Sequence, residues 1–462
     1  MTNQKKKIFK VLSPTAILGY GFPKDSFARG MAEKPDLIAV DAGSADPGPH
    51  YLGSGKSFTN KEGVKRDLTI MIEAGLKSKI PVVIGTAGGS GASPHLEWCA
   101  NVVREIAIEN NFSFKLGLIP GDIHPVIIKT ALNKNRISPL DHKTPLTRET
   151  IENSTHIVAQ MGVEPFIEAH KNQCDVILAG RAYDPSPFAA LPVMKGYDKG
   201  LALHMGKILE CAAIAATPGS GSDCALGILE KDCFILKPLS SERKFTRMSV
   251  SAHSLYEKAD PYHLHGPGGM LNLEQCVFTQ LEDGMVKVEG TIFEPSEVPT
   301  LKLEGASLDG YRTVSIAGIR DSLMIDTIDE ILLDVKNRVQ SFFPEIDMHK
   351  KLHLCIYGAN GVMGVLEPEI QKAHELGIVI EALGDSQDEA DTICSLFRST
   401  LLHYGYEGRI ATAGNLAFPF SPSDIPAGEV YRFSIYHLME TTDEDLFPLI
   451  YEAIKGAGNE TD

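Results

Sequence analysis

The chain has 462 residues, of which 43% are hydrophobic and 23% are charged, and its formal net charge is −16 at pH 7. This length exceeds one ordinary hydrophobic core and predicts two or three domains of a soluble globular protein. The acidic balance argues against nucleic acid or an anionic membrane as a general partner. No apolar run reaches the roughly 20 residues that cross a bilayer, and no signal peptide precedes the first strand, so we expect a cytoplasmic protein.

Apolar runs alternate with helical patterns over residues 1–225 and predict an α/β domain. The predicted strands are 8–12, 37–40, 81–84, 115–119, 157–160 and 175–179. The predicted helices include 26–33, 65–77 and 96–110. Alternation of this kind is typical of a mostly parallel sheet with flanking helices on both faces. Residues 41–51, which read DAGSADPGPHY, are expected to form a turn-rich loop without regular structure.

The segment 80–98 reads IPVVIGTAGGSGASPHLEW and is the expected centre of the chemistry. A strand here leads through a glycine-rich turn into a helix, and the backbone N–H groups of such a turn can bind an anion. The turn does not match G-x-G-x-x-G, and many such turns only permit close strand-to-helix packing. If the turn binds an anion, the substrate-binding residues are Gly88, Gly89, Ser90 and Gly91.

Past residue 217 the pattern changes. Runs at 277–281, 286–288 and 313–316 are alternating or β-branched and predict antiparallel strands, so we expect an α+β region over 226–350. A C-terminal α+β unit over 351–462 contains a predicted helix at 388–404 between strands at 379–382 and 431–438.

Residues 251–269 read SAHSLYEKADPYHLHGPGG. The Asp-Pro and Gly-Pro turns next to His263 and His265 predict a lid that closes the site built by the first half. The alternative is a connecting loop with both histidines in solvent.

Ligands of parallel sheets bind beyond the carboxyl ends of the strands, so polar residues that follow the strands are candidates for a site. Each of them alone is more often a solvated or capping side chain, and it is their collection at one edge that favours a site. The predicted catalytic residues are Asp41, His95, Asp122, Arg181 and Asp184, and the further predicted substrate-binding residues are His124, His263 and His265.

Arg181 could bind a substrate carboxylate or form a structural ion pair with Asp184, and both interpretations stay open. The sequence Gly55-Lys56-Ser57 ends like a P-loop, but His50 stands where its first glycine is required. The eight cysteines include no C-x-x-C pair, which indicates reduced, mostly buried thiols. The cofactor is unknown, and a divalent metal held by Asp and His from different loops is left open.

Four separated segments closely resemble the acyclic terpene utilisation family, called AtuA-like. They read VDAGSADPGPHYLG, GTAGGSGASPHLEW, AHSLYEKADPYHLHGPGG and AGNLAFPFSPSDIP, and together the resemblance spans nearly the whole chain. The resemblance implies catabolism of branched carboxylic acids and acyl-CoA-type intermediates, often beside a small companion protein.

We therefore expect an enzyme that moves a proton beside the carbonyl of a small carboxylic acid or its acyl-CoA ester, as a hydratase, dehydratase or isomerase. The glycine-rich turn and Arg181 would hold the negative charge of an enolate, and His95, Asp41 or Asp122 would move the proton. The competing hypothesis is a non-catalytic binding or scaffolding subunit that works with a small companion protein. We also expect a homo-oligomer.

Overall fold

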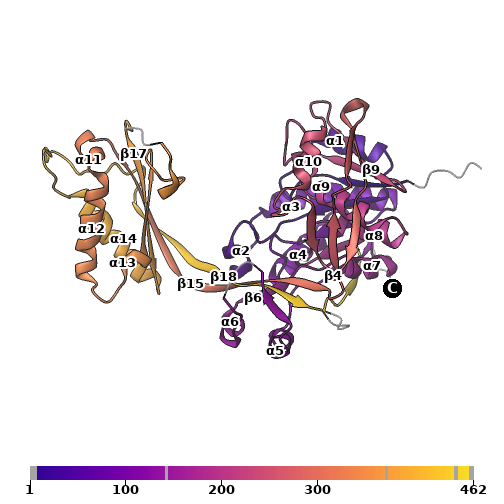
Figure 1. Ribbon diagram of the computed structural model, residues 1–462, viewed down its shortest axis with the longest axis horizontal. Coiled ribbons are helices and arrows are strands. Elements are labelled where there is room, and N and C mark those ends of the chain that lie inside the picture. The colour runs from indigo at the N-terminus through magenta and orange to yellow at the C-terminus, as the bar shows by residue number, and fades with distance from the viewer. Residues whose placement is uncertain (1–7, 141–143, 370–372, 442–445, 457–462) are drawn as a thin grey trace, which may run out of the picture. The chain divides into compact units, whose positions relative to one another are not determined.

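The computed structural model describes residues 8–140, 144–369, 373–441 and 446–456 (Figure 1). Its Cα trace forms two compact units, Met1–Ser307 with Phe433–Asp462 and Leu308–Arg432. Strand β15 (Thr300–Ile319) leads from the first unit into the second, and β18 (Asp424–Glu440) leads back. The expected division into domains at residues 225 and 350 stays a prediction, because compactness of the trace alone does not define a domain.

A ten-stranded sheet organises the first unit. Its five central strands are parallel and follow the spatial order β1-β2-β3-β7-β4, with the bounds β1 (Phe9–Ser13), β2 (Leu37–Asp41), β3 (Val82–Gly85), β7 (Val176–Ala179) and β4 (Phe114–Ile119). Continuous apolar runs suit these strands because helices cover both faces of the sheet. The predicted mostly parallel sheet with flanking helices is confirmed.

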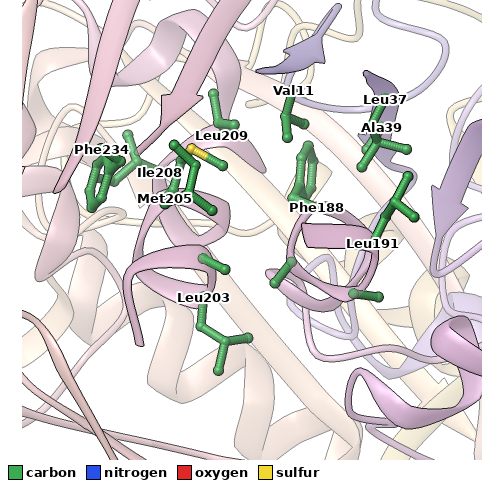
Figure 2. Close-up of a cluster of buried hydrophobic side chains, with 14 of the residues drawn as sticks. Val11, Leu37, Ala39, Phe188, Leu191, Leu203, Met205, Ile208, Leu209 and Phe234 are labelled. Carbon is green, nitrogen blue, oxygen red and sulfur yellow. The ribbon is translucent and has the colours of Figure 1, made fainter. Parts of the chain in front are cut away.

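Successive side chains of these strands enter two different cores, as the two-residue period of a strand requires. Val11, Leu37 and Ala39 pack with side chains of α8 (Ser186–Met194) and α9 (Lys199–Leu209), as Figure 2 shows. Their neighbours Leu12 and Ile38 pack with α1, α3 and α4. The remaining helices of this region are α1 (Lys24–Ala32), α2 (Pro49–Ser54), α3 (Lys61–Ser78), α4 (Ser93–Asn110), α5 (Pro125–Asn133), α6 (Arg148–Asn153) and α7 (Glu164–Lys171).

Antiparallel strands extend this sheet at both edges. Beyond β1 lie β8 (Ala225–Leu229), β9 (Cys233–Pro238), β13 (Val286–Glu289) and β12 (Val277–Gln280), and beyond β4 lies β19 (Ile450–Ile454). The two strands predicted near residues 277 and 286 therefore belong to the sheet of the first half. A local pattern predicts a strand but not its partner, which is chosen by tertiary packing.

Two expectations about the first half are wrong. The predicted fifth strand forms as β6 (His156–Ala159), but it pairs antiparallel with β15 and lies outside the parallel sheet. Its residues Ile157, Val158 and Ala159 are buried, and a buried strand gives the same apolar run in either kind of sheet. The expected loop at 41–51 ends early, because Pro49 starts helix α2 and proline suits the first helical position.

The predicted lid segment forms strands instead of an irregular loop. Helix α10 (Arg247–Ser254) is followed by β10 (His263–Gly266) and β11 (Gly269–Asn272), which pair antiparallel around a turn at Pro267 and Gly268. With β14 (Ile292–Pro295) they make a three-stranded sheet of the first unit.

The second unit packs helices against antiparallel strands, as expected for an α+β region. β17 (Leu376–Gly384) pairs with β15 and with β16 (Leu352–Tyr357), and its side chains alternate between buried and partly exposed. Helices α12 (Ile328–Phe342) and α14 (Gln387–Leu402) fill the core against these strands, with α11 (Ser322–Asp326) and α13 (Met348–Lys351) beside them. Within the described residues, no helix has the length and apolar character needed to span a bilayer.

Candidate functional site

A cavity of about 650 Å³ lies in the first unit, and residues that follow the parallel strand β7 contribute to its wall. This volume is in the range that holds a small ligand. Apolar side chains line part of the wall, among them Leu140, Met270 and Leu438. Its charged side chains are Asp46, Arg181, Asp184, Lys207, Glu257, Lys258, Glu294 and Lys302.

Arg181 lies on this wall with its guanidinium almost fully buried. Its Nε donates to Glu304 at 2.6 Å, and its NH1 donates to Asp184 at 3.0 Å and to the carbonyl of Ala182 at 2.9 Å. The structural ion pair with Asp184 therefore forms, and Glu304 is a second partner that the sequence analysis did not name. Burial would lower the pKa of Arg181, but Glu304 and Asp184 outweigh it and raise the pKa.

Glu304, on β15, is shared by two cations of the cavity. Lys302 Nζ lies 2.9 Å from Glu304 Oε1 and 4.2 Å from the centroid of the Tyr436 ring. Burial would raise the pKa of Glu304, yet Arg181 and Lys302 outweigh burial and hold this pKa at about 2. The carboxylate stays ionised and fixes both cations at the cavity wall.

A second buried ion pair joins Lys207 to Glu210, at the end of helix α9. Burial raises the pKa of Glu210 to about 8, and the charge of Asp184 adds to this rise in spite of Lys207. Lys207 itself keeps a raised pKa because Glu210 outweighs its burial. The pair thus places the Lys207 cation on the cavity wall with the Glu210 carboxyl as its partner.

Further carboxyl groups surround Asp184. Asp41, at the end of β2, is buried, and within the described residues its Oδ1 has no hydrogen-bond partner. Burial, together with the charges of Asp184 and Glu210, raises the pKa of Asp41. Glu257 lines the cavity, and burial raises its pKa, helped by the charges of Asp46 and Asp184. Burial and neighbouring negative charges thus act in the same direction on the pKa values of Asp41 and Glu257.

The β10–β11 segment reaches this cavity from the second half of the sequence. His265 and Pro267 line the wall that Arg181 lines, and a Cβ on Gly266 would approach the Tyr183 ring to 2.8 Å. His263 instead pairs with Asp260 at 3.2 Å and with Glu274 at 3.7 Å. Closure of a lid over ligand stays a prediction, and of the two histidines only His265 is placed for it.

The glycine-rich turn lies behind the cavity wall and is buried. A Cβ on Gly88 would come within 2.3 Å of the His95 carbonyl, and one on Gly91 within 2.3 Å of the Arg181 nitrogen. Both glycines have left-handed φ angles, +75° and +71°. This geometry is that of close packing, and Gly88, Gly89, Ser90 and Gly91 do not line the cavity, so anion binding by the turn stays a prediction.

Three other predicted residues also lie away from the cavity wall. The His95 ring is buried, with Nε2 3.0 Å from the Tyr51 carbonyl oxygen, and burial lowers its pKa. Asp122 accepts a hydrogen bond from Ser93 at 2.6 Å, and burial raises its pKa. His124 is exposed and caps α5. Roles in catalysis or binding for these residues stay predictions.

Within the described residues, no group of three or more His, Cys, Asp or Glu side chains is arranged to hold a metal ion.

Six residues of this site were not predicted from the sequence: Tyr183, Lys207, Glu257, Lys258, Lys302 and Glu304. Glu257 and Lys258 lie inside the segment singled out for its histidines. Lys207 had a signal of its own, since it interrupts an apolar helix and a charge in a buried helix needs a partner. Lys302 and Glu304 alternate with leucines in a strand pattern, which reads as an ordinary solvated face.

Comparison with known proteins supports the resemblance seen in the sequence. The model of the acyclic terpene utilisation family protein AtuA matches residues 54–418, which is most of the chain. No curated protein and no solved structure matches. The match includes the glycine-rich turn, Arg181 and the β10–β11 segment, and it carries a role in acyclic terpene utilisation. The chain belongs to the acyclic terpene utilisation family AtuA.

Proposed function

We propose that the chain is a catabolic enzyme that moves a proton next to the carbonyl of a small carboxylic acid or its acyl-CoA ester, as a hydro-lyase or an isomerase. The observation that carries this proposal is the shared wall of the cavity, where Arg181, Lys207 and Lys302 lie beside the carboxyl groups of Asp184 and Glu257. Cations and proton-binding carboxyls are the two components that removal of an α-proton requires.

The cations would stabilise negative charge on the oxygen atoms of the substrate. Lys302 and Arg181 are held by Glu304 in fixed positions, so they need little reorganisation when negative charge develops on an enolate oxygen. Each cation retains donor hydrogens beyond its ion pair, since an ammonium has three and a guanidinium five. The apolar side chains of Leu140, Met270 and Leu438 would bind a hydrocarbon tail.

Glu257 and Asp184 would have different roles in the proton transfer. Glu257 lines the cavity and its pKa is raised, which favours a carboxyl group that can accept and return a proton. Asp184 is four-fifths buried and ion-paired, so it would orient Arg181 and hold charge rather than carry the proton.

The test is exchange of the proton next to the carbonyl in D2O, followed by NMR on butyrate and butyryl-CoA, together with loss of the alkene absorbance of crotonyl-CoA. We expect Glu257→Gln to slow exchange by roughly a hundredfold or more. Glu152→Gln, which changes an exposed carboxylate on α6, serves as the matched control. His95→Gln and Asp122→Asn test the residues chosen from the sequence. Unchanged exchange in Glu257→Gln would remove this residue from the proposal, and no exchange by the native protein with any probe would refute it.

A non-catalytic subunit with a small companion protein is the second candidate, and exposed apolar side chains of the second unit favour it. Val362, Val365 and Leu366, near the turn Gly364–Leu366, are 84%, 101% and 75% exposed. Contiguous apolar exposure of this kind is typical of a protein contact. Replacing all three by serine would abolish binding of the companion and leave proton exchange unchanged if the two functions are separate.

A further inference from the structure

Lys258 differs from the other cations of the cavity in having no anionic partner. Arg181 and Lys302 are bound to Glu304, and Lys207 is bound to Glu210. Among the residues that the structure describes, no hydrogen bond or ion pair reaches Lys258 Nζ, which lies 5.5 Å from the centroid of the Tyr183 ring. Lys258 thus lacks the carboxylate contact that raises the pKa values of Arg181, Lys207 and Lys302.

The surroundings of Lys258 lower the pKa of its amine. Burial lowers its pKa, and the nearby charge of Lys207 lowers it further, while Asp184 and Glu210 oppose the shift only in part. Lys207 is itself fixed by Glu210, so this positive field does not move away. A lysine that is desolvated and placed beside another cation is the arrangement that activates an amine as a nucleophile.

The backbone also presents Lys258 to the cavity. Glu257 has a φ of +60°, a left-handed conformation that is unfavourable for a non-glycine residue. The turn allows two consecutive residues, Glu257 and Lys258, to line the same wall, and the amide of Lys258 donates to the Leu255 carbonyl at 3.1 Å. Backbone strain maintained at a cavity wall is a common feature of functional sites.

Tyr183 lies under the amine. Within the described residues its buried hydroxyl has no hydrogen-bond partner, and burial raises the pKa of this hydroxyl, so it stays protonated. A protonated donor at this place can bind the oxygen atom of a carbonyl group whose carbon atom the Lys258 amine attacks.

We propose that Lys258 is a catalytic residue that forms an imine with a ketone or aldehyde carbonyl, and that the substrate class is a small oxo acid. This deepens the proposed function and rests on it for the site, because the imine would acidify the neighbouring C–H bond whose proton Glu257 accepts. The amine lone pair attacks the carbonyl carbon, and the carbonyl π electrons move to oxygen. The two amine hydrogens then leave with this oxygen as one water molecule as the C=N bond forms.

A cavity carboxyl supplies the proton that converts the imine into the iminium, and this cation withdraws the electrons of the C–H bond. Hydrolysis with one water molecule returns the free amine and the carbonyl product. No oxidant or reductant takes part in the cycle.

Trapping with sodium cyanoborohydride tests the imine. The native protein is incubated with pyruvate, acetoacetate or butyrate, and labelled peptides are mapped by mass spectrometry. We expect both oxo acids to give an added mass equal to that of the acid less one oxygen atom, located on Lys258, and we expect no label from butyrate. Lys258→Arg removes the primary amine and should reduce trapping by roughly tenfold or more, while Lys61→Arg, on the surface helix α3, should leave trapping unchanged.

The proposal would be overturned if no label is found, or if the labelled lysines are simply the most exposed ones. This measurement is made on the native protein and does not depend on how any variant folds. Proton exchange into butyryl-CoA without trapping would leave the proposed function standing and remove the imine. Trapping on Lys258 without such exchange would support the imine and refute the thioester as substrate.

Discussion

Glu304→Gln offers the sharpest test of the electrostatics of this site. The substitution keeps the shape of the side chain and removes the negative charge between Arg181 Nε, at 2.6 Å, and Lys302 Nζ, at 2.9 Å. It also turns an amide donor toward one of two cationic donors, in a position that is 1% exposed. Removing one partner of a buried ion pair strands an uncompensated charge and typically costs about 3–5 kcal/mol.

The pKa of Glu304 gives a separate figure for the same interaction. A carboxyl whose pKa falls from 4.5 to about 2 on folding contributes about 3 kcal/mol at neutral pH, at about 1.4 kcal/mol for each pKa unit. Because the folded pKa is the lower one, this contribution is complete above about pH 5 and is lost as the pH falls toward 2. The difference in unfolding free energy between the native protein and Glu304→Gln should therefore shrink below pH 5.

Urea unfolding followed by circular dichroism measures both effects. The control is Glu152→Gln, which removes an ion pair of equal length, 2.6 Å, from a carboxylate that is 61% exposed. Surface pairs contribute about 0–1 kcal/mol, so the control should lie near the native protein. Equal losses in the two variants, or a loss for Glu304→Gln that does not change between pH 7 and 4, would refute the reasoning.

Three further predictions follow from single residues. Gly91→Ala would place a new Cβ 2.3 Å from backbone, whereas Gly196→Ala, at a position that also has a left-handed φ, would place it with no described atom within 4 Å. Gly91→Ala should therefore lower the unfolding free energy, measured in urea, by about 1–3 kcal/mol more than Gly196→Ala. His170→Phe should reduce the loss of stability between pH 6.5 and 4, because burial lowers the pKa of this histidine to about 4 and the unfolded chain takes up its proton first. Iodoacetamide should label the exposed Cys355 of the native protein and spare Cys99, whose burial raises its thiol pKa to about 12; fast labelling of Cys99, followed by peptide mapping, would contradict this.

The sequence predicted where strands form better than it predicted which strands pair with one another. The strands near residues 37, 81 and 175 are short apolar runs followed by turn-forming residues, and all three form in the central sheet. The strand near 157 is a similar apolar run, but it pairs with β15. The sequence could not predict this pairing, because hydrophobic periodicity reports burial and carries no information on the partner strand. Elements that join the sheet from far along the chain, such as β12 and β19, depend on register that only packing decides.

The same limit explains which site residues could be predicted. Arg181 and Asp184 follow a parallel strand, and the rule that ligands bind beyond strand ends singled them out before any contact was known. Glu304 lies 123 residues from Arg181 in a strand with an ordinary alternating pattern, so nothing local marks it as the partner of a buried guanidinium. Charges become informative only when their burial is known, and burial of a strand face is a tertiary property.

The glycine-rich turn was singled out from the sequence, and it supports the cavity residues through tertiary contacts. Thr86 and Gly91 contact the residues that follow β7, since the Arg181 amide donates to the Gly91 carbonyl at 2.9 Å and the Ala182 amide donates to Thr86 Oγ1 at 3.3 Å. A side chain at Gly91 would occupy the position of the Arg181 backbone, so glycine here sets where the guanidinium can lie. The segment chosen from the sequence thus acts on the cavity through the backbone that it supports, and a change at Gly91 should alter the cavity without touching its ligand. We therefore expect Gly91→Ala to impair trapping of oxo acids and proton exchange together, whereas Lys258→Arg should impair trapping and leave the folded stability close to that of the native protein.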